Sequence, residues 1–120
     1  RTESDGRIVM IERTILDYLS EKLSVLVRLE EEPDMPDEYV LIEKTGGKKT
    51  NYISRATIAI QSYAKSLYRA MQINEDVKAA LEEIVTLDEI SRCSLNSDYN
   101  YTDTTRKKYR YQAVFDIVHY

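Results

Sequence analysis

The sequence predicts an α+β domain in which two helices cover one face of a mostly antiparallel sheet of four to five strands. Two segments carry apolar residues at helical spacing, whereas five others alternate between apolar and polar residues or are rich in β-branched side chains. Their order is helix, three strands, long helix, two strands (α-β-β-β-α-β-β). Because the chain has 120 residues and no internal repeat, we expect residues 10–120 to form one domain.

The longer helix is predicted over residues 66–85, which no Gly or Pro interrupts and whose first turn Ser66 can cap. The shorter helix is predicted over residues 11–23. Residues 1–9 lack periodicity and Met10 resembles a natural start, so we expect a disordered or artificial leader. The apolar residues expected to face the sheet are Leu67, Ala70, Met71, Val77, Ala80, Leu81, Ile84 and Val85 in the longer helix and Ile11, Ile15, Leu16, Leu19 and Leu23 in the shorter.

The first three strands are predicted at residues 25–29, 39–44 and 52–63. Two prolines and many acidic side chains make residues 30–38 a loop, which we expect to be mobile until a partner compensates its charge. Residues 45–51 (TGGKKTN) are predicted to form a flexible turn without the spacing of a phosphate-binding loop. In the third strand Ala56, Ile58 and Ile60 share one face and Thr57, Ala59 and Gln61 the other.

The last two strands, at residues 89–100 and 107–120, are predicted to form a hairpin across a polar turn at residues 102–106. Strict alternation places Cys93, Leu95, Tyr99 and Tyr101 on one face of the first strand and Arg92, Ser94, Asn96 and Asp98 on its wet face. In the second strand Tyr109, Tyr111, Ala113, Phe115 and Ile117 share a face.

The composition, with 42% hydrophobic and 32% charged residues, predicts a soluble, folded, cytoplasmic protein. No apolar run approaches the roughly 20 residues of a membrane helix. A net charge of −4 and a pI near 5.1 argue against binding of nucleic acid by the molecule as a whole. Ten Tyr beside one Phe and no Trp suit strands and interfaces.

The residue inventory predicts no enzyme, no cofactor and no metal site. His119 is the single His and lies next to the C-terminal residue, and no Ser or Cys nucleophile stands in a motif with it. Cys93 is the single Cys, predicted to be a reduced core thiol, and one Cys with one His cannot form a zinc site. A small hydrolase would instead need a compact pocket with perturbed carboxylates.

We therefore expect interfaces to carry the function. The basic and aromatic segment 106–111 either binds a nucleic-acid strand or protects the hairpin edge from unwanted pairing. If copies of the chain assemble, this segment would face the acidic loop 30–38 of a neighbouring copy across the joint. The candidate interface residues are Glu30, Glu31, Glu32, Tyr99, Tyr101, Arg106, Lys107, Lys108, Tyr109, Arg110 and Tyr111.

Four segments together suggest a known family: MIERTILDYLSEKL, DEYVLIEKTGG, ATIAIQSYAKSLYRAMQINEDVKAAL and SLNSDYNYTDTTRKKYRYQAVFDIVHY. A strand followed by S-Y-A-x-S-x-x-x-A and an aromatic-rich last strand are the recurring features. On these grounds residues 10–120 resemble the tail-terminator (tail-completion) proteins of siphophages.

The resemblance implies a virion protein, assembled in the host cytoplasm, that forms a homo-oligomeric ring, commonly hexameric. Such a ring caps the tail tube and meets the head connector, while DNA passes through it without sequence-specific binding. The resemblance assigns no catalytic or ligand-binding residue. The alternatives are another neck or head-closure protein, or a small nucleic-acid-associated module that uses segment 106–111.

Overall fold

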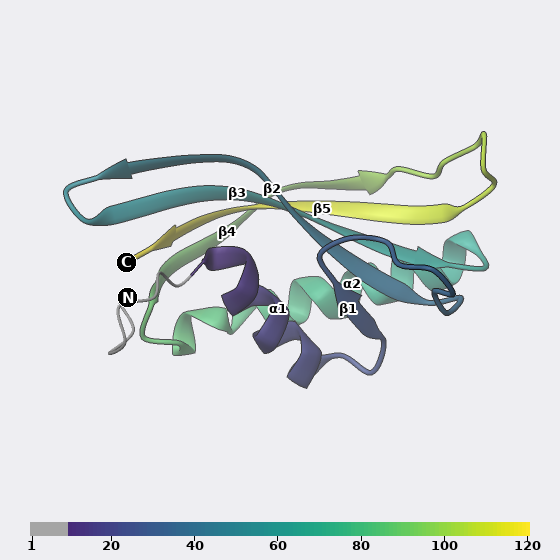
Figure 1. Cartoon of the computed structure of the whole chain (residues 1–120), viewed down its shortest axis with the longest axis horizontal. Helices are drawn as coiled ribbons and strands as arrows, with labels where there is room; N and C mark the ends of the chain where they lie inside the picture. Colours follow the sequence, from purple (N-terminus) through teal and green to yellow (C-terminus); the bar gives the residue numbers. More distant parts are fainter. Residues whose placement is uncertain (1–9) are drawn as a thin grey trace.

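The computed structural model describes residues 10–120, so the predicted leader at 1–9 lies outside the described residues. The chain forms a five-stranded sheet with two helices beneath one face (Figure 1). The element order confirms the α+β class and the predicted sequence of helices and strands. The elements are α1 (Ile11–Lys22), β1 (Leu26–Arg28), β2 (Tyr39–Thr50), β3 (Ile53–Ala64), α2 (Leu67–Glu82), the short 3₁₀ helix η1 (Ile84–Thr86), β4 (Ile90–Asn100) and β5 (Tyr109–His119).

The sheet has the strand order β1-β2-β3-β5-β4. Among the described strands, only β1 runs parallel to its neighbour, and the other pairs are antiparallel. Since β1 pairs with no more of β2 than Tyr39–Leu41, β2 is an edge strand from Ile42 onward within the described part of the chain. The opposite edge of the sheet is β4.

The core lies between the helices and the strand residues that point toward them. In α2 each buried side chain lies three or four positions from another, as a single helical stripe requires. Ser66 caps this helix as predicted, because its hydroxyl accepts a hydrogen bond of 3.1 Å from the Arg69 amide. The predicted burial of Met71 and Val85 is wrong, since they are 40% and 47% exposed. Met71 lies one residue past the stripe, and Val85 follows the end of the helix. The buried residues are Ala70, Ile73, Asn74, Val77 and Leu81 in α2 and Ile84 just beyond it.

The predicted turn at residues 45–51 is wrong, because β2 continues to Thr50 and the turn consists of Asn51 and Tyr52. A bulge between Lys44 and Gly46 shifts the register and lets the strand continue. A Cβ at Gly47 would lie 2.8 Å from Cε of Lys44, so glycine makes room for that side chain. Asn51 and Tyr52 both have positive φ angles, 50° and 68°, as a two-residue turn of type I′ requires.

A second bulge, between Leu95 and Ser97 in β4, overturns the predicted faces of that strand. One extra residue on one strand reverses the side on which every later side chain lies. Asp98 therefore faces α2, where it accepts hydrogen bonds from Asn74 Nδ2 (3.1 Å) and Lys78 Nζ (2.9 Å). Tyr99 lies on the opposite face, beside Gln112.

Candidate functional site

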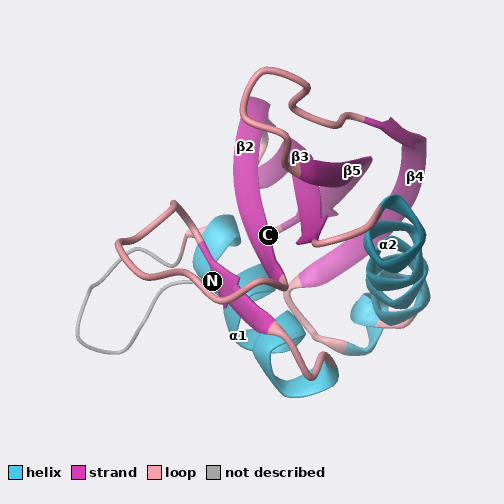
Figure 2. Cartoon of the chain, turned by 90° about the vertical axis from the view of Figure 1, so that its right-hand side faces the viewer, coloured by secondary structure: helices cyan, strands magenta, loops and turns pink. Residues whose placement is uncertain are grey.

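The sheet face turned away from both helices, here called the open face, holds the candidate site. Viewed along the strands, both helices lie on the same side of the sheet (Figure 2). The loops at residues 29–38 and 101–108 both lie toward one end of the molecule, and the β2–β3 turn lies at the other (Figure 1). Side chains in the middle of the open face are short, among them Thr57, Ala59 and Ser97. The two ends of this face therefore differ in chemistry.

Four tyrosines form a cluster at the loop end of the open face: Tyr39, Tyr63, Tyr99 and Tyr101. Tyr39 and Tyr63 stand opposite each other in β2 and β3, and their rings stack with centroids 4.4 Å apart. Each is only 4% exposed. The guanidinium of Arg110 donates to the Tyr63 hydroxyl (2.9 Å) and lies 4.3 Å from the centre of the Tyr101 ring. This cation–π contact fixes the arginine in place.

Glu31, from the acidic loop, joins this cluster to the loop between β4 and β5. Its carboxylate accepts hydrogen bonds from the Tyr39 hydroxyl (3.1 Å), Arg106 Nη2 (3.1 Å) and Lys108 Nζ (3.4 Å). Burial opposes ionisation of Glu31, but the hydrogen bonds and the two cations outweigh burial and hold its pKa below the usual value. Burial, followed by the charge of Glu31, raises the pKa of Tyr39, so its hydroxyl stays a donor.

Two glutamines connect the tyrosines across the sheet. Gln61 Nε2 donates to Gln112 Oε1 (2.8 Å), and Gln61 Oε1 accepts from the Tyr63 hydroxyl (3.1 Å). Gln112 Nε2 in turn donates to the hydroxyl of Tyr99. Because these polar groups bond to one another, the network is a rigid contact surface rather than a set of free reactive groups.

The structure brings some of the predicted interface residues together and leaves the others apart. Glu31, Tyr99, Tyr101, Arg106, Lys108 and Arg110 belong to the tyrosine cluster and its attached loops. Tyr109 and Tyr111 pair with Ala64 and Ser62 and so point to the helix side. Glu30 and Lys107 are exposed in the loops, and Glu32 pairs with Arg28 at 3.3 Å.

The attraction expected between segment 106–111 and the acidic loop exists, but within one chain. Arg106 and Lys108 bind Glu31 of the same molecule, so they are not free to face an acidic loop across a joint. The same loop is held at its far end, where Arg69 donates to both oxygens of Glu38 at 2.9 and 3.1 Å. Lys65 pairs with Asp37 at 3.4 Å. These contacts favour an ordered loop, contrary to the mobility that the sequence predicts.

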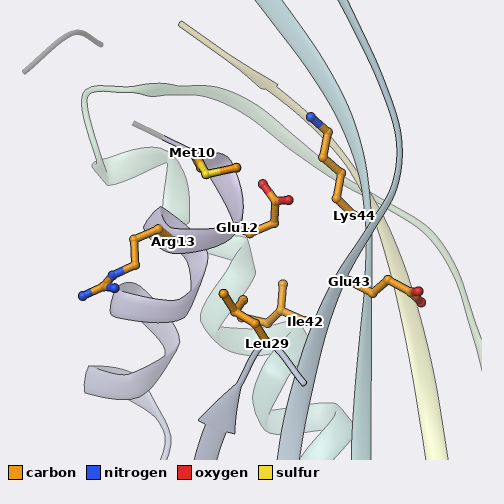
Figure 3. Close-up of a pocket in the computed structure, with 7 residues that line it drawn as sticks. All are labelled: Met10, Glu12, Arg13, Leu29, Ile42, Glu43 and Lys44. Carbon is orange, nitrogen blue, oxygen red and sulfur yellow. The ribbon is translucent and has the colours of Figure 1, made fainter. Parts of the chain in front are cut away.

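A shallow hollow of about 270 Å³ lies beside the edge of β2, against the start of α1 (Figure 3). Met10, Leu29 and Ile42 supply its apolar wall, and Glu43 points away from it. The charged side chains of Glu12, Arg13 and Lys44 stand at its margin without converging on one point (Figure 3). The hollow therefore offers contact area but no arrangement of a nucleophile with a base.

Two other reactive groups, Cys93 and His119, are half-buried, which suppresses their chemistry. Burial raises the pKa of the Cys93 thiol to about 11, which disfavours the nucleophilic thiolate. Burial, with a smaller effect of the charge on Lys44, lowers the pKa of His119. Within residues 10–120 no three His, Cys, Asp or Glu side chains are grouped to hold a metal ion. No helix in this range is long and apolar enough to cross a membrane.

Comparison with known proteins finds no matching family model and no significant match among curated proteins. The geometry adds residues that the sequence analysis did not select: Tyr39, Tyr63, Gln61 and Gln112. Tyr39 and Tyr63 share a cross-strand position, as do Gln61 and Gln112. Only strand register places these pairs together, and no local pattern in the sequence encodes that register.

Proposed function

We propose that the chain is a structural assembly protein that binds copies of itself in a closed ring, as the siphophage tail terminators that its sequence resembles do. Such a ring caps a tail tube, meets the head connector and lets DNA pass, and it belongs to the virion neck. The resemblance over residues 10–120 supports this proposal, and the α+β fold is compatible with it.

The observation that carries the proposal is the pair of different edges on one sheet. A ring needs head-to-tail contacts, and these require two different complementary surfaces on each subunit. Residues 42–50 of β2 form one edge and β4 forms the other, on opposite sides of the sheet. Exposed strand edges are pairing surfaces that a partner strand can extend. Another neck or head-closure protein would use the same geometry.

The alternative of nucleic-acid binding through segment 106–111 has less support. Arg106 and Lys108 are bound to Glu31, and Arg110 is bound to Tyr63 and packed on Tyr101. Phosphate would have to replace these contacts before it could bind there.

The oligomeric mass over a range of concentrations tests the ring, with light scattering for mass and electron microscopy for shape. We expect a closed assembly whose size reaches a plateau. Leu95→Glu on β4 should dissociate it, whereas Val85→Glu in η1 should not, although the two native side chains are equally accessible at 48% and 47% exposed. A monomer at every concentration, or a dimer that never grows, would overturn the proposal.

A further inference from the structure

Three cations lie in one row across the open face, at the end opposite the tyrosine cluster, with one valine between the second and the third. Lys48 in β2 pairs with Arg55 in β3, Arg55 pairs with Val118 in β5, and Val118 pairs with Arg92 in β4. A bulge between Ile90 and Arg92 gives Arg92 this register. Neighbouring strands lie about 4.8 Å apart, so this row, here called the basic row, spans roughly 14 Å.

The basic row lacks the compensation that the cations at the other end receive. Lys48 and Arg55 are like charges directly opposite each other, an arrangement that destabilises a strand pair. None of the ion pairs within residues 10–120 includes Lys48, Arg55 or Arg92. All three side chains are exposed.

The nearest acidic residue on this part of the face is already engaged. Asp116 lies one row along the sheet, beside Thr57, and accepts hydrogen bonds from Thr57 Oγ1 (3.4 Å) and Asn96 Nδ2 (3.0 Å). Glu43 lies farther along β2, opposite Ala59. Asp116 keeps its charge in these hydrogen bonds but makes no ion pair with the row, so the three cations stay unpaired within the described residues.

The surface beside the row is hollowed and built partly from small residues. A hollow of about 390 Å³ is lined by Lys48 and Arg55 together with Gly47, Ala56, Thr57, Asp116, Ile117 and Val118. Small side chains beside two cations allow an anionic group to come close to both. Residues 44–57, which form the outer part of the β2–β3 hairpin, also carry Lys44 and Lys49 and contain no carboxylate.

We propose that the basic row binds the phosphate backbone of double-stranded nucleic acid without reading its sequence. A row of about 14 Å is longer than a single phosphate and suits an extended polyanion, whose successive phosphates can meet successive cations. The acidic character of the whole chain does not prevent this, because screening at physiological salt limits each charge to about 8 Å. The site is independent of the ring, since it needs one subunit only.

Fluorescence anisotropy with a labelled duplex of 20 base pairs, titrated between 25 and 200 mM KCl, tests the proposal. Three phosphate contacts predict that log K falls with log salt concentration with a slope of about −2.7. Lys48→Gln, Arg55→Gln and Arg92→Gln should each reduce the slope by about 1, and the triple variant should not bind. Arg55→Lys should keep the slope. Lys107→Gln is the matched control, because it removes an exposed cation from the other end of the molecule.

Arg55→Glu separates loss of binding from loss of folding. It places a carboxylate opposite Lys48, so it should abolish duplex binding while raising the melting temperature. Several results would overturn the proposal: no salt-dependent binding by the parent protein, unchanged binding by the triple variant, or loss of binding in Lys107→Gln alone. If the triple variant changes the oligomeric mass but not duplex binding, the row meets an acidic surface of a second copy instead. The mass measurement in the same buffers keeps this outcome distinct from failure of the ring proposal.

Discussion

Replacing Asp98 by Ala tests on which face of β4 this side chain lies, which is where the alternation in the sequence and the fold disagree. Alternation places Asp98 on the wet face of its strand, where its loss would matter little. The bulge before Ser97 turns it instead toward α2, onto the buried amide of Asn74 and the amine of Lys78. The two placements predict different stabilities for one variant.

The expected loss of stability in Asp98→Ala follows from the polar groups that the variant leaves without a hydrogen-bond partner. Asn74 is fully buried, and its Oδ1 already lacks a hydrogen-bond partner, so the variant leaves the whole amide unsatisfied. An unsatisfied buried polar group costs about 1 to 3 kcal/mol. Lys78 keeps its second ion pair, at 2.7 Å from Glu75, so its share is small. We expect a loss of about 2 kcal/mol, which for 120 residues lowers the melting temperature by roughly 8 °C.

Thermal unfolding followed by circular dichroism measures this difference, with Asp88→Ala as the control on an exposed carboxylate. Adding Asn74→Leu to Asp98→Ala should recover part of the lost stability, because both polar partners are then absent. If the melting temperatures of Asp98→Ala and Asp88→Ala agree within about 1 °C, then Asp98 does not bind Asn74, and the bulge does not turn Asp98 toward α2.

Three further predictions follow from single residues. Glu31→Gln should lower the melting temperature at pH 7 more than Glu30→Gln does. Because folding lowers the pKa of Glu31, this difference in melting temperature should vanish as the pH falls from about 4.3 through the folded pKa. A difference that persists at pH 2 would contradict this. Folding also lowers the pKa of His119, so below about pH 6.5 the unfolded chain binds more protons than the folded protein does. In thermal melts the parent protein should therefore lose stability as the pH falls through this range, and His119→Gln should lose less. Cys93, with its pKa raised to about 11, should react with a thiol reagent at pH 8 at least about tenfold more slowly in the native protein than in denaturant, and equal rates would show that its thiol is not protected.

Local pattern was enough to predict the helices and the existence of the strands. In α2 the apolar spacing and a capping Ser66 act within one element, so no knowledge of the rest of the fold is needed. The same spacing could not fix the helix rotation to better than one residue. The pattern therefore predicts Met71 in the core, whereas the structure buries Ile73 there.

Irregularities in the strands could not be predicted in this way. Residues 93–101 carry apolar or aromatic side chains at every second position except Ser97, which predicts a regular strand, yet β4 contains a bulge between Leu95 and Ser97 while its pairing with β5 continues on both sides. Gly46 and Gly47 suggested a turn by composition, but they lie within β2 because pairing with β3 extends the strand. In both places the pairing partner determines the register, and the alternation of side chains within the segment does not fix it.

The open face shows why residue type alone does not identify a binding surface. Segment 106–111 and the basic row have the same kinds of cation, but in the segment Arg106 and Lys108 are paired with Glu31, which lies 75 residues from Arg106 in sequence. No comparable carboxylate reaches Lys48 or Arg55 within the described residues. A cation bound to a carboxylate and a tyrosine hydroxyl stabilises its own fold, whereas an unpaired cation opposite another cation gains stability only when an anion arrives. The candidate anion site is therefore the basic row, whose cations are unpaired, and not segment 106–111, although that segment has more cations close together in the sequence.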